Sequence, residues 1–184
     1  GNYSTTNTTG TNNICIGPYT YTATQGGSKA IGIGYYVNSA AGYTTLGDES
    51  SDIRAAHGTA TWSTVSDERV KKDIEDSTVG LAFINDLRPV TFNYRNKGDI
   101  PEEFTGYEKD STEAYKYSTT NHGFIAQEVK KVIDNHPDIA DGFKLWDVRD
   151  TGQQEVAEGA LMPMMVKAVQ ELSAKVEELE DKLK

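Results

Sequence analysis

Ser66 and Lys71 are spaced so that they could act together as a nucleophile and its base. A serine that attacks a peptide carbonyl must give up its hydroxyl proton, and a neutral lysine can accept it when burial lowers the lysine pKa from about 10.4. A turn or a single helical turn over residues 66–71 would bring the side chains together, with Lys72 as the competing base. Because such spacing recurs by chance in charged sequences, the interpretation depends on the rest of the chain.

The pair lies where the character of the 184-residue chain changes. Residues 1–65 are rich in Gly, Thr, Tyr and Asn and carry two basic and three acidic side chains, whereas residues 66–184 carry 16 basic and 25 acidic ones. This break predicts a β-rich part at 1–65, an α+β core at 66–156 and a C-terminal helix at 157–184.

The first part repeats an aliphatic residue followed by glycine, at Ile16-Gly17, Ile31-Gly32 and Leu46-Gly47, each 15 residues after the last. Strand and turn formers between these steps predict stacked β repeats that cannot bury their own faces. The steps resemble repeats of trimeric autotransporter adhesin heads and phage fibre shafts, in which three chains share one core. Residues 53–65 alternate like a strand, and residues 1–12 are predicted to be disordered.

The second part is predicted to be a small α+β domain. A helix is expected over residues 78–87, capped by Ser77 or Thr78, and Pro89 separates it from a strand at 90–94. Residues 96–120 form a long acidic loop without periodicity, to which we assign no chemistry. A strand, a helix and a strand are expected at 122–125, 127–133 and 144–149.

The chain ends in a predicted helix from residue 158 onward, with Pro163 tolerated near its start. Its apolar residues are spaced alternately by four and three, the a/d pattern of a coiled coil: Met165, Val169, Leu172, Val176, Leu179 and Leu183. The alternative is an amphipathic helix packed on its own domain, but so narrow an apolar seam favours self-association.

Four motifs follow one another after the composition break: Ser66-Asp67-x-Arg69-x-Lys71-x-x-Ile74, Leu87-Arg88-Pro89-Val90-x-Phe92-x-Tyr94, Gly123-Phe124-Ile125-Ala126-Gln127-Glu128-Val129 and Val166-Lys167-Ala168-Val169-Gln170-Glu171-Leu172. Together they resemble the C-terminal intramolecular chaperone of phage tailspikes, tail fibres and endosialidases, a self-cleaving serine–lysine peptidase domain. The resemblance covers residues 66–184 and leaves residues 1–65 outside it.

The resemblance implies that the Val65–Ser66 bond is cut, with Ser66 as nucleophile and Lys71 as base. Asp67 and Arg69 match the motif and would order the turn between Ser66 and Lys71. An N-to-O acyl shift would convert the peptide bond to an ester, which water would then hydrolyse. Each molecule would turn over once.

The resemblance also implies an intertwined parallel homotrimer that folds the upstream segment of its own chain. His122 would be an orienter or oxyanion donor, while Gln127 and Glu128 would cap a helix and satisfy buried backbone groups. The expected setting is the precursor of a virion tail fibre or spike, assembled in the host cytoplasm, from which the chaperone is released.

Composition argues against several other classes of protein. The net charge of −10 and the lack of a basic stripe argue against nucleic acid as a partner, and no apolar run approaches the ~20 residues of a membrane span. A single cysteine, Cys15, and three isolated histidines, His57, His122 and His136, predict neither a metal site nor a cofactor. Because the chain begins with Gly1 and its first methionine is Met162, we expect it to be part of a longer protein.

Two alternatives to the self-cleaving chaperone belong to other functional classes, a structural protein and an enzyme with external substrates. One is a non-cleaving structural trimerisation tip of a fibre, with or without a receptor to bind. The other is a serine hydrolase for external substrates, which is disfavoured because the sequence lacks a nucleophile elbow such as G-x-S-x-G.

Overall fold

A computed structural model describes residues 9–139 and 144–184 of the chain. The chain divides into two compact units, residues 1–74 and 75–184. The predicted boundary at residue 65 lies inside the first unit, which also contains the segment from Ser66 to Ile74. Disorder is predicted from the sequence for residues 1–12, of which 1–8 lie outside the described residues. The Thr11 N–H donates a hydrogen bond to Ser28 Oγ, and the Thr11 carbonyl accepts one from the Lys29 N–H, both at 3.0 Å.

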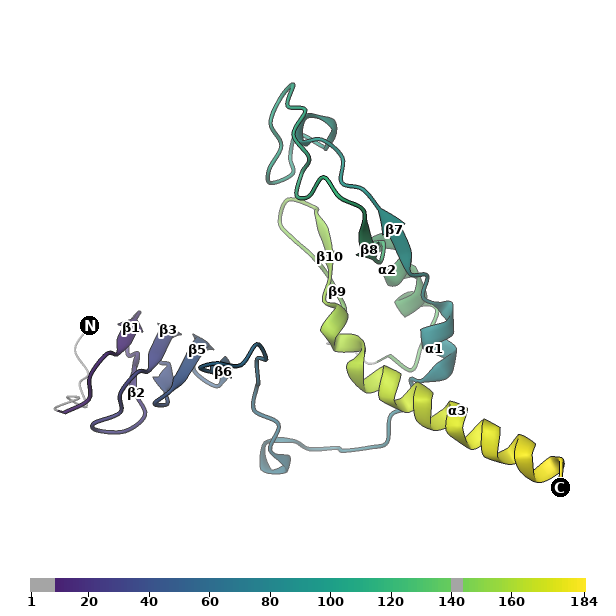
Figure 1. The fold of residues 1–184 in the computed structure, drawn as a ribbon, viewed down its shortest axis with the longest axis horizontal. Coiled ribbons are helices and arrows are strands. Elements are labelled where there is room, and N and C mark those ends of the chain that lie inside the picture. The colour runs from purple at the N-terminus through teal and green to yellow at the C-terminus, as the bar shows by residue number, and fades with distance from the viewer. Residues whose placement is uncertain (1–8, 140–143) are drawn as a thin grey trace. The chain divides into compact units, whose positions relative to one another are not determined.

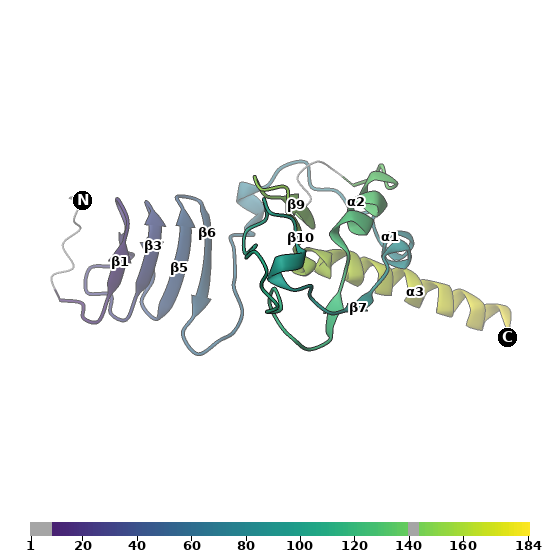
Figure 2. The same ribbon diagram turned by 90° about the horizontal axis from the view of Figure 1, so that it is seen from above.

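The described part of the first unit contains six short strands, and a 3-10 helix, η1 (Glu68–Val70), follows them. In chain order the strands are β1 (Ile14–Ile16), β2 (Tyr21–Thr22), β3 (Ile31–Tyr35), β4 (Asn38–Ser39), β5 (Tyr43–Asp48) and β6 (Ser51–Ala56). Four of them form a sheet in the order β1-β3-β5-β6, side by side in Figure 2. The first three run parallel, and β6 is antiparallel to β5.

The strand register shows that the repeated steps are not the ones predicted from the equal 15-residue spacing. Ile16 pairs with Ile33, and Ile33 pairs with Leu46, so the middle step is Ile33-Gly34 rather than Ile31-Gly32. Glycine at the end of the strand explains the alignment. A Cβ at Gly34 (φ +140°) would lie 1.8 Å from the Gly47 carbonyl oxygen, so no side chain fits where the strands meet. Gly32 does not occupy such a position.

One face of the sheet is covered by the chain that crosses it. Val37 and Ser39 are fully buried there, and a Cβ at Gly32 would meet the side chains of both. Ser39 Oγ lies 3.3 Å from Thr45 Oγ1, within hydrogen-bonding distance in the buried layer. Beyond β6 the chain turns back, and Ser63 and Arg54 exchange two backbone hydrogen bonds.

The second unit is α+β, as predicted. Its elements are α1 (Leu81–Asp86), β7 (Val90–Phe92), η2 (Lys97–Asp99), β8 (Asn121–Gly123), α2 (Ala126–Asp134), β9 (Trp146–Val148), β10 (Gln154–Val156), η3 (Glu158–Leu161) and α3 (Met162–Lys182). The strands pair as two antiparallel ribbons, β7 with β8 and β9 with β10 (Figure 1). Among the described residues, no helix has both the length and the apolar character needed to cross a membrane.

The core of this unit lies between α1, α2, the β9–β10 hairpin and the start of α3. Leu145 is fully buried, Phe83 is 1% exposed and Val129 is 2% exposed, and Leu161 packs in the same cluster. Pro163 lies at the first turn of α3, where its missing N–H and fixed φ are tolerated.

Helix α1 begins later than predicted and without the predicted cap. Gly80, rather than Ser77 or Thr78, occupies the N-cap position and supplies no side chain. The Leu81 N–H instead donates to Glu171 Oε2 of α3 at 2.8 Å. The start of α1 is therefore fixed by a residue 90 positions away in the sequence.

The predicted loop at 96–120 is an ordered lobe. Lys97 Nζ lies 2.7 Å from Glu113 and 3.5 Å from Glu108, and these two carboxylates raise its pKa. Gln153, in the turn between β9 and β10, accepts a hydrogen bond from the Thr105 N–H at 3.0 Å and donates one to the Tyr115 hydroxyl at 3.0 Å.

Candidate functional site

A single turn brings Ser66 and Lys71 together. The 3-10 helix η1 lies between them, and the Lys71 N–H donates to the Glu68 carbonyl at 2.9 Å as the turn closes. Lys71 Nζ then lies 2.7 Å from Ser66 Oγ, to which it donates a hydrogen bond. This distance is short enough for direct proton transfer between the two groups.

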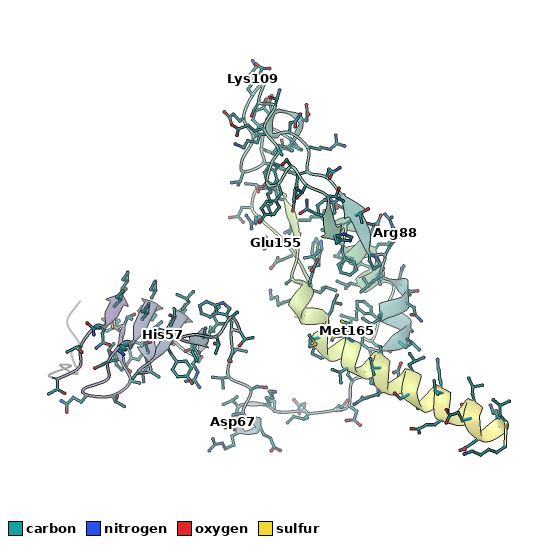
Figure 3. The ribbon with its side chains drawn as sticks, in the orientation of Figure 1. His57, Asp67, Arg88, Lys109, Glu155 and Met165 are labelled. Atoms are coloured by element: carbon teal, nitrogen blue, oxygen red, sulfur yellow. The ribbon has the colours of Figure 1, made fainter. Side chains whose placement is uncertain are left out.

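The turn is fixed by Asp67 and Arg69, which lie between the pair. Asp67 caps η1 by accepting a hydrogen bond from the Arg69 N–H at 2.9 Å, and its carboxylate binds the Arg69 guanidinium at 2.9 and 2.6 Å (Figure 3 labels Asp67). These hydrogen bonds lower the pKa of Asp67 to about 2 and raise that of Arg69. The Asp67 carboxylate is therefore ionised at neutral pH, where it keeps all three hydrogen bonds to Arg69.

Lys72, the competing base, has a different neighbour. Its Nζ lies 3.9 Å from Asp73, and its side chain is 93% exposed. Within the first unit the geometry therefore distinguishes Lys71 from Lys72 as the partner of Ser66.

The whole segment from residue 66 to residue 78 is exposed in the single chain, Ser66 and Lys71 included. A lysine that acts as a base must be neutral, and removal from water favours the neutral form. The single chain therefore supplies the contact between nucleophile and base but not the desolvation that this chemistry needs.

His122 belongs to the second unit, so its predicted role beside Ser66 remains a prediction. It lies on β8, opposite Thr91 of β7, and lines an open cleft of about 570 Å³. Tyr94, Gln127 and Arg149 line the same cleft.

Glu128 has a different role from the predicted one. Helix α2 begins without a side-chain cap, and Glu128 accepts hydrogen bonds from Arg88 at 2.5 and 3.0 Å. This bidentate pair lowers the pKa of Glu128 and raises that of Arg88. Arg88 thus joins the second motif to the third, and no local pattern predicts this pairing because its partner lies 40 residues away. Gln127 is exposed and does not cap α2.

The seam residues of α3 are exposed in the single chain. Helix α1 packs against a neighbouring face of α3, where Ala168 is buried and Glu171 binds the start of α1. Figure 1 shows the second half of α3 extending past α1, and Figure 3 labels Met165 on the first half. The exposed fractions run from 47% to 87% over Met165, Val169, Leu172, Val176, Leu179 and Leu183.

Within residues 9–139 and 144–184, no group of three or more His, Cys, Asp and Glu side chains is arranged to hold a metal ion. Cys15 is a free, exposed thiol, and partial burial raises its pKa.

Comparison with known proteins agrees with the motifs. Residues 66–137 match the family model described as the chaperone of endosialidase. This confirms the predicted resemblance over that part of the chain and supports an intramolecular chaperone role. The match begins at Ser66 and includes the first three motifs, whereas the fourth motif and α3 lie beyond it. A search of curated proteins finds no match to the chain.

Proposed function

We propose that this chain is an intramolecular chaperone that assembles the β segment before Ser66 with two further copies and then releases itself by cutting the Val65–Ser66 bond. The observation that carries the proposal is the 2.7 Å contact between Lys71 Nζ and Ser66 Oγ, across a turn fixed by Asp67. That contact lies at the first residue of the family match.

The proposed reaction is an intramolecular acyl transfer followed by hydrolysis. Neutral Lys71 takes the Ser66 hydroxyl proton, and Oγ attacks the Val65 carbonyl carbon. The bond from that carbon to the Ser66 nitrogen breaks as the nitrogen takes up a proton, which leaves an ester between Val65 and Ser66 Oγ. Water then cleaves the ester, giving a Val65 carboxylate and a Ser66 with free hydroxyl and amino groups. Because the chain cuts itself, each molecule reacts once.

Assembly is proposed to precede cleavage. Ser66 and Lys71 are exposed in the single chain, so neighbouring copies must supply the burial that makes Lys71 neutral. This order would prevent release of the chaperone before the β segments are in register. Long-range strand pairing is slow, so such a β segment folds slowly without assistance. A trimerising module would speed its assembly by raising the effective concentration of the three copies.

Self-association is proposed to run through α3. Its seam from Met165 to Leu183 is apolar and exposed, while α1 occupies a different face of the helix. Knobs-into-holes packing of parallel helices would bury this seam. The product after cleavage would be a homotrimeric tail fibre or spike of a virion, assembled in the host cytoplasm.

The alternative is a permanent trimeric tip that does not cleave itself, with or without a receptor. The exposure of Lys71 favours this alternative, since self-cleavage requires a lysine that is removed from water.

Intact mass of the purified chain after incubation, beside a Ser66→Ala variant, separates the two. We expect fragments 1–65 and 66–184 from the wild type and an uncut variant. An uncut wild-type trimer would rule out self-cleavage and leave the structural tip as the function.

A further inference from the structure

Three exposed tyrosines gather at one end of the strands in the first unit. The ring centroids lie 5.7 Å apart for Tyr19 and Tyr36, 5.8 Å apart for Tyr19 and Tyr35, and 6.1 Å apart for Tyr35 and Tyr36. Tyr19 is 39% exposed, Tyr35 is 43% exposed and Tyr36 is 49% exposed. A single exposed aromatic side chain is ordinary, but three neighbouring rings make a continuous aromatic surface. We call these three residues the tyrosine cluster.

Backbone hydrogen bonds between successive turns fix the cluster to the sheet. The Tyr36 N–H donates to the Pro18 carbonyl at 3.0 Å, and the Glu49 N–H donates to the Tyr35 carbonyl at 2.9 Å. Tyr35 also pairs with Asp48 at the end of β3 and β5. The rings and two carboxylates are therefore carried by neighbouring turns of one ladder, and the surface they form does not depend on a free loop.

Two of the tyrosines have a backbone conformation that is unfavourable for a bulky residue. Tyr19 has a φ of +56° and Tyr36 a φ of +54°, in the left-handed region that favours glycine and asparagine. Glu49, at the matching position of the next turn, has a φ of +52°. All three turns thus carry a large side chain where glycine would cost less, and strain of this kind gathers at functional sites.

The charged side chains of residues 9–65 are divided between the two ends of the strands. The acidic ones all lie at the end that carries the tyrosine cluster, and none of them forms an ion pair with another described residue: Asp48, Glu49 and Asp52. The basic ones lie toward the other end. Lys29 precedes the start of β3, and the Arg54 guanidinium lies 5.0 Å from the ring centroid of Tyr43, where β5 starts. The end with the tyrosine cluster therefore attracts cations.

A guanidinium group matches this surface better than other common groups do. It is planar and stacks on aromatic rings, and its fork of N–H donors binds a carboxylate in a bidentate way. A lysine ammonium would gain the charge attraction without the stacking or the fork. A neutral ligand would gain contact with the rings alone, and an acidic partner would be repelled by the unpaired carboxylates.

We propose that the tyrosine cluster, with Asp48 and Glu49 beside it, binds arginine side chains of a partner protein. The rings stack on the guanidinium groups, and the two carboxylates accept their hydrogen bonds. The site lies within residues 1–65, so it would stay with the β segment after a cut at Val65–Ser66. Neither cleavage nor a particular number of copies is needed for it.

The test uses the full chain with Ser66→Ala, so that no copy is cut, and a short peptide as the probe. The probe is acetyl-Gly-Arg-Gly-Arg-Gly-amide, and the comparison peptide has lysine at both arginine positions. Blocked ends leave the side chains as the only charges of either peptide. NMR titration of the chain with ¹³C-labelled tyrosine rings reports both the affinity and the rings that are contacted.

Two variants remove the two parts of the site separately. The ring variant carries Tyr19→Asn and Tyr36→Asn, since asparagine tolerates the positive φ of both turns. The charge variant carries Asp48→Asn and Glu49→Gln, which keep the size of the side chains and all three rings. The matched control carries Tyr117→Asn, at a 61% exposed tyrosine of the second unit.

We expect the arginine peptide to shift the ring signals of the cluster and to bind at least ~5-fold more tightly than the lysine peptide. Each of the two site variants should weaken its binding ~10-fold or more, and the control should bind like the parent. Unchanged cluster signals, or a ring variant with the affinity of the parent, would overturn the proposal. Equal binding of the lysine peptide would show general charge attraction, and an unaffected charge variant would show an apolar contact, and either result excludes an arginine site. Failure of the wild type to cleave itself would leave these results unaffected.

Discussion

At the scale of single residues, the contact between Ser66 and Lys71 depends on Asp67. Its carboxylate caps η1 and binds the Arg69 guanidinium. The hydrogen bonds that fix the turn are therefore made by residues between Ser66 and Lys71, and not by the Ser66 hydroxyl or the Lys71 ammonium group. The turn alone therefore holds the Ser66 and Lys71 side chains in contact, without a hydrogen bond to another described residue of the first unit.

The Asp67 carboxyl should titrate at about 2 instead of its ordinary 3.8, because the Arg69 hydrogen bonds favour the charged form. The contribution of Asp67 to the turn is then complete above pH 3.8 and is lost as the pH falls toward 2. A carboxyl-carbon NMR titration measures the midpoint. In an Arg69→Leu variant the midpoint should rise toward 3.8 but stay below it, because the backbone N–H of residue 69 still donates to the carboxylate. An unchanged midpoint would show that the guanidinium is not the main cause.

Lys71→Met should slow cleavage by about 10²–10⁴-fold, the range over which a positioned base accelerates proton transfer. Lys72→Met is the matched control, because it removes the neighbouring charge without touching Ser66. The fraction of intact chain is followed by mass spectrometry over time. If Lys71→Met and Lys72→Met slow cleavage equally, Lys71 is not the base.

At the scale of elements, the sequence predicts the interiors of helices better than their ends. The apolar spacing of α2 predicts a helix over 127–133, within the observed Ala126–Asp134. For α1 the predicted caps, Ser77 and Thr78, follow a sound local rule, yet Glu171 supplies the acceptor from a distant element. Local rules cannot find that acceptor, because it arises only when α3 packs beside α1.

Glu171→Ala should lower the free energy of unfolding by about 1 kcal/mol, the typical worth of a helix cap. The Leu81 N–H would lose its acceptor at a part-buried position. Urea denaturation followed by circular dichroism measures the change, with Glu177→Ala, an exposed position on the same helix, as the control. If both variants unfold at the same urea concentration, the contact contributes nothing to stability.

Phe83→Ala should cost about 3–5 kcal/mol, because the ring is 1% exposed in the core and a cavity would remain. Its ring also contacts the His136 ring edge-on at 5.3 Å. The same denaturation experiment applies, with Asn85→Ala on the exposed side of α1 as the control. A loss below ~1 kcal/mol would mean that this core is loosely packed.

At the scale of the whole molecule, the exposed α3 seam should hold the copies together. Val169→Lys with Val176→Lys should reduce the assembly to single chains, because two ammonium groups per chain would enter an apolar seam. Light scattering reports the mass. Gln170→Lys with Glu177→Lys changes exposed positions outside the seam and should leave the mass unchanged. A seam variant with the mass of the parent would exclude α3 as the assembling element.

The sequence predicts the α+β class and the location of the Ser66–Lys71 pair, because both follow from local composition and motif. It does not predict the stacking step of the first unit. Equal spacing pointed to Ile31-Gly32, whereas the strands align Ile33-Gly34, since Gly34 alone permits the close backbone approach to Gly47. Register depends on how the hydrophobic faces of neighbouring strands align and on the turns between them, and equal spacing in the sequence does not specify either.

The reversal of the last strand, β6, has a consequence for the end that cleavage would leave behind. A strand at the edge of a sheet has unpaired backbone groups, and these can pair with a strand of another chain and cause aggregation. Here β6 runs antiparallel to β5, and Ser63 satisfies both backbone groups of Arg54 on its outer side. Removal of the chaperone after Val65 would keep Ser63 in place, so the backbone of Arg54 would stay paired and could not accept a strand of another fibre.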